Sequence, residues 1–236
     1  MATTDITRSS FYRGKRYAGV HMQQGRVLTD DDYNSDVDID LDDDRLTRLG
    51  VIGPYGSSDM GFAVSTRSIA GGRIDFDIGA ATLWLGGLRL ERLQDETFIR
   101  QSDWLNNPGQ PEPAGAGERF DLVYVTAWMQ PVSAVEDNEL LEAALGGPDT
   151  TVRLRPMARI SILPGVGADN CEEAWAALRD QLAADGMGEV DGEMRLVPDT
   201  RFTVGLAPGT GGDDLCAPEV VGGYLGAENH AIRCTL

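Results

Sequence analysis

Four aspartates alternate along one short stretch, with the spacing of ligands in a metal-binding loop: Asp36, Asp38, Asp40 and Asp42. An EF-hand calcium loop also needs glycine at its sixth position and glutamate at its twelfth. Counted from Asp36, those positions hold Leu41 and Thr47, and counting from Asp38 fails in the same way. If the stretch is helical, alternate carboxylates also point to opposite sides. We therefore interpret these aspartates as facing solvent or a partner, and we expect neither a bound metal nor any other cofactor.

The residue types that other common catalytic sites require are scarce or badly spaced. His21 and His230 are the only two histidines, and the chain has neither a G-x-S-x-G nor an H-E-x-x-H motif. The glycine-rich stretch 208–214 lacks the Gly-Lys-Ser/Thr ending of a phosphate-binding loop. The 38 acidic residues still leave a polysaccharide- or wall-hydrolysing carboxylate pair as an alternative. No spacing singles out such a pair, so the primary expectation is a protein that is not an enzyme.

The net charge reverses abruptly near the start of the chain. Residues 1–28 have a net charge of +4, whereas residues 29–44 contain nine aspartates and no basic residue, a net charge of −9. A uniformly solvated surface does not need such a reversal, so it suggests a docking element. The side chains that we expect to take part, with one tryptophan from a later loop, are Arg13, Lys15, Arg16, Tyr17, Met22, Gln23, Gln24, Arg26, Asp30, Asp31, Asp32 and Trp104.

Residues 1–28, the basic arm, have too few apolar side chains to form a core alone. We expect the arm to be extended and to gain order by lying against another surface. That surface is either the acidic helix of its own chain or the acidic helix of a neighbouring subunit. We favour the neighbour, because exchanged arms would link copies of the chain around a symmetry axis. Salt should then weaken the contact.

Residues 29–49 are predicted to form one acidic helix. Thr29 is a suitable N-cap, and the aspartates that follow it favour the positive end of a helix. Glycine and proline at 50–54 end the pattern. Apolar side chains recur at i, i+4 and i+8 and predict a buried stripe of Tyr33, Val37 and Leu41, with Leu46 and Leu49 further along. We therefore expect Leu41→Ala to destabilise the protein more than Asp42→Ala.

The rest of the chain predicts an α+β fold, mostly antiparallel and β-rich, with one or two further helices. Strand pairs are indicated at 62–78, on either side of Ala70-Gly71-Gly72, and at 82–93, where Gly86-Gly87 suits a primed two-residue hairpin turn. The remaining elements are expected at 97–100 (edge strand), 120–128 (central strand), 138–145 (two helical turns), 152–163 (strand), 171–184 (helix), 194–197, 202–206 and 231–236 (strands). We divide the chain into an N-terminal arm and helix, 1–54, and a β-rich domain, 55–236. That domain is either continuous or split at the 101–118 loop, where Trp104 either packs or anchors a partner.

Composition excludes several partner classes. A net charge of −18 opposes binding to nucleic acid and to anionic membranes. No uncharged apolar run is long enough to insert into a bilayer, and the first residues lack the apolar region of a signal peptide. We therefore expect synthesis in the cytoplasm. The three cysteines fit no metal site, and they are either buried thiols or include a Cys171–Cys216 pair.

Three stretches, in order along the chain, carry a resemblance to a known family. They are YAGVHMQQGRV with TDDDYN at 17–34, LVYVTAW with ALGGPDTTVR at 122–153, and GGYLGAEN at 222–229. Together they resemble a family of phage-tail-like proteins classified only as a domain of unknown function (the DUF6519 type). Two departures are Tyr33, where that family usually has tryptophan, and the residues after Asn229.

The resemblance implies a structural subunit of a contractile injection system, near the baseplate or spike, with no catalytic chemistry. Its implied partners are other tail or baseplate subunits and copies of itself, in a cytoplasmic or released extracellular particle. A rival interpretation is the base of an adhesin or tail fibre. Under it, a receptor-binding part would follow Leu236, since the last predicted strand runs to that residue.

Overall fold

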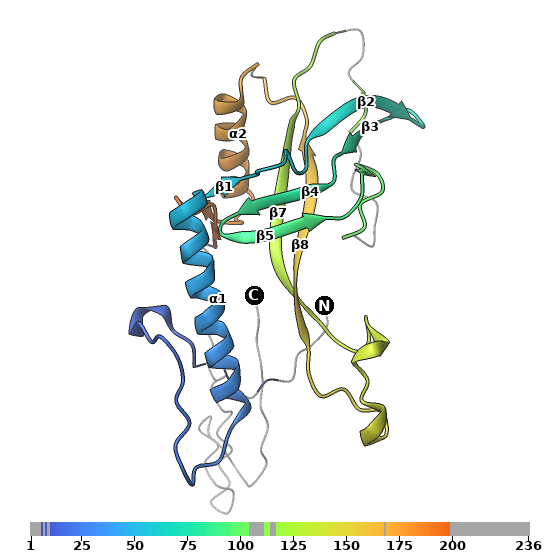
Figure 1. Cartoon of the computed structure of the whole chain (residues 1–236). Helices are drawn as coiled ribbons and strands as arrows, with labels where there is room; N and C mark the ends of the chain where they lie inside the picture. Colours follow the sequence, from blue (N-terminus) through green and yellow to red (C-terminus); the bar gives the residue numbers. More distant parts are fainter. Residues whose placement is uncertain are drawn as a thin grey trace, which may run out of the picture.

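The computed structural model describes residues 6, 8, 10–103, 111–113, 117–167 and 169–198. Predictions for Trp104, for the strands at 202–206 and 231–236, and for the 222–229 stretch lie outside these residues. The described part of the chain is an α+β fold in which every strand pairing is antiparallel, as predicted. Figure 1 shows a long helix, α1, standing beside a body made of strands.

The acidic helix α1 spans Asp30–Ile52. Thr29 caps it as predicted, and the Thr29 and Asp32 side chains form a reciprocal capping box. Gly50 does not end the helix, which continues to Ile52. Gly53, with φ +100°, is its C-cap. A single glycine costs a helix only about 1 kcal/mol, so the prediction of an end at 49 was three residues short.

Both predicted strand pairs are present, and each is a hairpin. Strands β2 (Val64–Ala70) and β3 (Arg73–Ile78) pair, and β6 (Glu96–Thr97) joins β3. Strands β4 (Ala81–Leu85) and β5 (Leu88–Arg92) form the second hairpin, with β1 (Tyr55–Gly56) beside β4. The Gly-Gly pair at each turn has positive φ at both residues, which primed turns require.

Strands β7 (Leu122–Val132) and β8 (Arg153–Leu163) form a long ribbon of two 11-residue strands. The apolar run in β7 predicted a central strand, but within the described residues β7 pairs only with β8. Its apolar character comes instead from other layers packing on its faces. The predicted helical turns at 138–145 are two separate 3-10 turns, η2 (Asn138–Leu140) and η3 (Ala143–Leu145). Figure 1 shows them where the ribbon extends past β4 and β5.

The core forms where the β1–β4–β5 sheet, the β2–β3–β6 sheet and the β7–β8 ribbon meet. Phe76 and Phe98 stack with ring centroids 4.9 Å apart, and Ile78, Leu90 and Ile160 pack around them. Side chains also close the outer edge of β8. Gln101 accepts from the Ile160 N–H at 2.8 Å and donates to the Ile160 carbonyl at 3.0 Å, and Asp103 accepts from the Ala158 N–H at 3.1 Å. These bonds replace the strand neighbour that the edge lacks.

The helix predicted at 171–184 is α2, Cys171–Ala184, which buries Ala174 and Leu178. Strands β9 (Glu189–Val190) and β10 (Leu196–Val197) follow it and pair. Cys171, at the start of α2, is an exposed thiol. Among the described residues, neither helix combines the length and apolar character needed to span a bilayer.

The C-terminal half of α1 is attached to the body at the β4–β5 turn. Arg48 donates to the Gly87 carbonyl at 3.4 Å, and Arg45 forms an ion pair with Glu193 at 3.0 Å. Gly87 also lies against the backbone of Arg45, where a Cβ would come within 2.5 Å of the Arg45 carbonyl oxygen. The N-terminal half of α1 points away from the sheets, and the arm runs beside it (Figure 1).

Candidate interaction surface

The N-terminal half of α1 buries a different face from the one predicted. The buried residues are Asp31, Ser35 and Ile39, whereas the predicted stripe is exposed, Tyr33 by 65%, Val37 by 38% and Leu41 by 40%. The prediction that this stripe is buried was therefore wrong. The physical reason is that the arm presents hydrogen-bond donors to the helix, and carboxylate and hydroxyl groups satisfy them where an apolar side chain could not.

The start of the arm is held by Asp31 and Ser35. Arg8 forms an ion pair with Asp31, Nε to Oδ2, at 2.8 Å, and the Ser10 N–H donates to the other oxygen of Asp31 at 2.9 Å. The hydroxyls of Ser10 and Ser35 lie 2.8 Å apart. The Asp31 side chain is 4% exposed although that of Arg8 is 70% exposed. A buried carboxylate is therefore satisfied by one charged and one backbone donor, the arrangement that makes its burial tolerable.

Further along, the arm makes two more contacts with α1. Arg13 lies 3.6 Å from a carboxylate oxygen of Asp42 and 3.8 Å from one of Glu193. The Val20 N–H donates to Asp36 at 2.9 Å. Within one chain, then, the arm lies on its own acidic helix, which is one of the two surfaces that the sequence analysis proposed. These contacts are hydrogen bonds and ion pairs.

Between these contacts the arm forms a compact turn. Arg13–Lys15 is a single 3-10 turn, η1, and Arg16 follows it with a left-handed backbone, φ 58°. Tyr12 lies over Gly14 so closely that a Cβ there would come within 2.6 Å of the ring. The Lys15 ammonium lies 5.8 Å from the Tyr17 ring centroid, a cation–π contact. Glycine at position 14 is therefore what allows the tyrosine to fold back over the turn.

The remaining predicted arm residues lie at a second turn. Gln23, Gln24 and Arg26 surround Gly25, whose φ is +74°, and the Arg26 N–H donates to the Gln23 carbonyl at 3.3 Å. Met22, just before the turn, is 56% exposed. The turn reverses the chain so that it enters α1 at Asp30. Its side chains are not brought onto the buried face of α1.

The first-turn aspartates of α1 have different roles. Asp31 binds the arm, whereas Asp32 serves the helix itself: the Thr29 hydroxyl and N–H both donate to it, at 2.8 and 3.1 Å. These hydrogen bonds lower the pKa of Asp32 below its usual value. Asp30 is the first helical residue. Ser10, Ser35 and Val20 were not predicted from the sequence. Of these, only Ser35 has a local signal, because it continues the i, i+4, i+8 spacing of Asp31 and Ile39.

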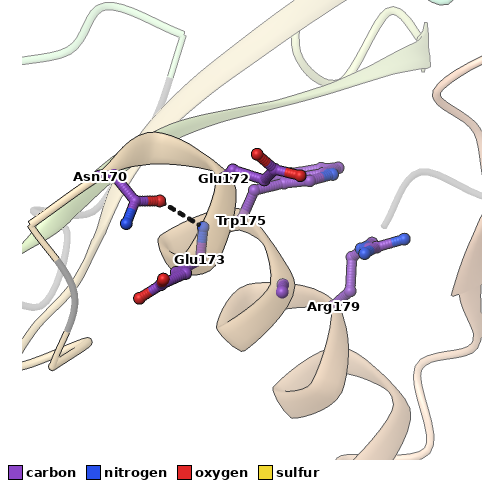
Figure 2. A pocket seen from close by; sticks show the side chains of 6 residues that line it. Asn170, Glu172, Glu173, Trp175 and Arg179 are labelled. Carbon is purple, nitrogen blue, oxygen red and sulfur yellow. Dashed lines mark hydrogen bonds between the residues drawn. The ribbon is translucent and has the colours of Figure 1, made fainter.

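A shallow hollow of about 690 Å³ lies along α2. Figure 2 shows Trp175 and Arg179 on its wall, one helical turn apart, and Asn170 at the helix start. The Asn170 side chain accepts from the Glu173 N–H at 2.9 Å, so it caps the helix. The charged tips point to solvent and do not converge. This arrangement offers no set of groups for acid–base or nucleophilic chemistry.

A second hollow, of about 510 Å³, lies between β2–β3 and β7–β8. Two of its three charged side chains hold each other: Arg119 donates to both oxygens of Asp121, at 2.8 and 3.0 Å, and the Gly165 N–H donates to Asp121 at 2.9 Å. Burial alone would raise the pKa of Asp121, but these hydrogen bonds outweigh it and lower that pKa. The carboxylate is thus a fixed acceptor that closes the end of the ribbon.

The described part of the chain contains no group of histidine, cysteine or acidic side chains that could hold a metal ion. Comparisons with family models, with curated proteins and with solved structures found no match. The resemblance noted above therefore stands on its three sequence stretches alone.

Proposed function

We propose that this protein is a non-catalytic structural subunit of a phage-tail-like contractile injection system, associated with the baseplate or the spike region. The observation that carries the proposal is where its first family-like stretch, 17–34, lies. In that stretch Tyr17 is 65%, Met22 56% and Tyr33 65% exposed. A sequence pattern shared for the sake of core packing would be buried, so a shared pattern on the surface favours contact with other molecules.

The chemistry of the two hollows supports the same proposal. In the first, the neutral Asn170 side chain caps α2, and in the second Arg119 and Asp121 form an ion pair; neither hollow gathers its polar groups at a common point. The arm and α1 are charged, and they form an edge that extends beside the sheets (Figure 1). Such an edge is suited to being buried between subunits of a larger assembly, with copies of this chain and other tail or baseplate subunits as partners.

Particle fractionation tests the proposal. Contractile particles from cells that make this protein would be purified on a density gradient, and the protein would be located by mass spectrometry and by gold-labelled antibody. We expect it in the particle fraction, near one end of the tube. Its deletion should prevent assembly or leave particles without a baseplate. Normal particles in the deletion strain, with the protein found only outside them, would contradict the proposal.

The same strains separate the two rival interpretations. An adhesin base would leave particles intact but unable to attach to cells. A hydrolase would release fragments from purified cell-wall polymer in the absence of particles. Substitution of a single carboxylate pair would abolish that release.

A further inference from the structure

The arm presents aromatic and basic side chains away from its own helix. Tyr12 is 66% and Tyr17 65% exposed, and the cations of the same turn, Lys15 and Arg16, are exposed as well. Neither cation forms an ion pair with any residue that the structure describes. The arm tip, residues 12–22, therefore combines apolar area with positive charge that no described acidic residue pairs.

Helix α1 presents the complementary combination. Its outer stripe, Tyr33, Val37 and Leu41, follows one side of the helix at four-residue spacing. Asp40, one position before Leu41, is exposed, as is Asp43. Within the described ranges neither of these carboxylates forms an ion pair. Asp40 borders the stripe, and Asp43 follows Asp40 one helical turn on. An apolar stripe with unpaired carboxylates at this edge fits an aromatic, basic partner.

The arm cannot cover this stripe in its own chain. Its contacts with α1 are at Asp31, Ser35, Asp42 and Asp36. Residues 31, 35, 39 and 42 follow each other at three- and four-residue spacing, so they share one side of the helix. Asp36 lies between that side and the outer stripe. The arm is therefore held away from the outer stripe. The arm tip and the outer stripe both remain exposed in the same molecule.

We propose that a second copy of this chain covers the outer stripe: the arm tip of each copy docks on the stripe and flanking aspartates of the other. The inference rests on the proposed structural role and names one partner within it. In a two-fold pair both contacts form at once, and in a ring each copy contacts the next. In this contact between two copies, the opposite charges provide specificity. Tyr12, Tyr17 and the outer stripe provide the buried apolar area.

Charge-reversed variants test this contact between full-length chains. Variant one carries Lys15→Glu and Arg16→Glu, and variant two carries Asp40→Lys and Asp43→Lys. By sedimentation, wild-type protein should associate, and each variant alone should dissociate at least about tenfold more readily. An equimolar mixture of the two variants should associate again, because each reversed arm meets a reversed helix. An arm that bound only its own helix could not be rescued by mixing.

A matched control removes the effect of net charge. Arg153→Glu with Arg155→Glu, on the exposed end of β8, changes the net charge as much as variant one does. Mixed with variant two, this control should not restore association. Val37→Ser should weaken wild-type association without any change of charge. Raising the salt from 0.1 to 1 M shortens the screening length from about 10 to about 3 Å and should weaken it too.

Three results would overturn the inference: wild-type protein that stays monomeric at every concentration, variants that associate as well as wild type, or a variant mixture that stays dissociated. Any of these, with the protein still found in purified particles, would reject the self-contact and leave the structural role standing. If the protein is absent from purified particles but mixing the two variants restores association, the structural role is rejected and the self-contact stands.

Discussion

At the scale of single residues, two buried charged side chains are compensated in different ways: hydrogen bonds hold Asp31, whereas Arg92 has an ion pair and an aromatic ring but no hydrogen-bond partner among the described residues. Asp31 is 2% exposed and is held by Arg8 and the Ser10 N–H. Arg92 is 6% exposed; it pairs with Glu96, and its guanidinium lies 4.8 Å from the Phe62 ring centroid. Burial lowers the pKa of Arg92, although the nearby Asp103 opposes the shift. Removing one member of such a pair leaves the other uncompensated.

We expect Asp31→Ala to destabilise the protein more than Leu41→Ala. The aspartate change removes two short hydrogen bonds from a buried site and should lower the free energy of unfolding by about 1–3 kcal/mol. Leu41 is 40% exposed, so its truncation should cost about 0.5 kcal/mol or less. Urea unfolding of both variants checks the ranking. A larger loss in Leu41→Ala would show that the predicted stripe is buried after all.

Glu96 offers a second residue-scale prediction. Glu96→Leu should lower the free energy of unfolding by about 3–5 kcal/mol, because it leaves the buried Arg92 guanidinium unpaired. The double variant Arg92→Leu with Glu96→Leu should be less destabilised than Glu96→Leu alone, since it removes both charges. Thermal unfolding of the three proteins measures the difference. Equal losses in the single and double variants would mean that water or another group neutralises Arg92.

At the scale of elements, the attachment of α1 depends on one glycine. Gly87 has φ +80° at the β4–β5 turn, and a Cβ there would meet the Arg45 carbonyl oxygen at 2.5 Å. The turn therefore needs glycine twice over, for its backbone conformation and for the close approach of the helix. The contact fixes the angle at which α1 and the arm leave the sheets.

Gly87→Ala should separate the helix from the hairpin. We expect a loss of about 2–4 kcal/mol in the free energy of unfolding, from positive φ and from the collision. Gly71→Ala is the matched control, because Gly71 also has positive φ, 56°, at a hairpin turn but no atom lies within 4 Å of its Cβ position. It should cost only about 1 kcal/mol. Hydrogen exchange at α1 amides should rise in the first variant alone, and equal effects at both turns would leave backbone strain as the whole explanation.

At the scale of the whole molecule, the core and the interaction surface are separate. The core cluster forms among the sheets and contains no residue of the arm or of α1. The arm touches α1 and Glu193 through polar contacts. A molecule built in this way can lose its arm and keep its sheets, which makes a clean deletion experiment feasible.

Deletion of residues 2–16 should leave a folded chain that no longer enters larger assemblies. The deletion removes the contacts of Arg8, Ser10 and Arg13, so we expect α1 to lose about 1–3 kcal/mol of stabilisation while the sheets unfold cooperatively as before. Circular dichroism checks folding, and ultracentrifugation or particle imaging at low and high salt checks assembly. Unchanged incorporation into particles at both salt concentrations would reject the arm as an assembly element.

The sequence by itself determined the elements whose signals are local. Thr29, the glycine pairs at 71–72 and 86–87, and the apolar spacing in 171–184 act within a few residues, so α1's start, both hairpins and α2 lie where they were predicted. It also determined the charge reversal between residues 1–28 and 29–44, because composition needs no coordinates, and the docking role inferred from that reversal stays a prediction.

Only the tertiary structure decided which way α1 faces and what the arm touches. Tyr33, Val37 and Leu41 have the period of a buried stripe, yet Asp31, Ser35 and Ile39 have the same period and are the buried set. Periodicity specifies a face but cannot choose between two faces when the neighbouring element is polar. That choice rests on the donors of Arg8, Ser10 and Val20, which lie 16–25 residues away from their acceptors in sequence. Long-range hydrogen bonds of this kind leave no local pattern to read.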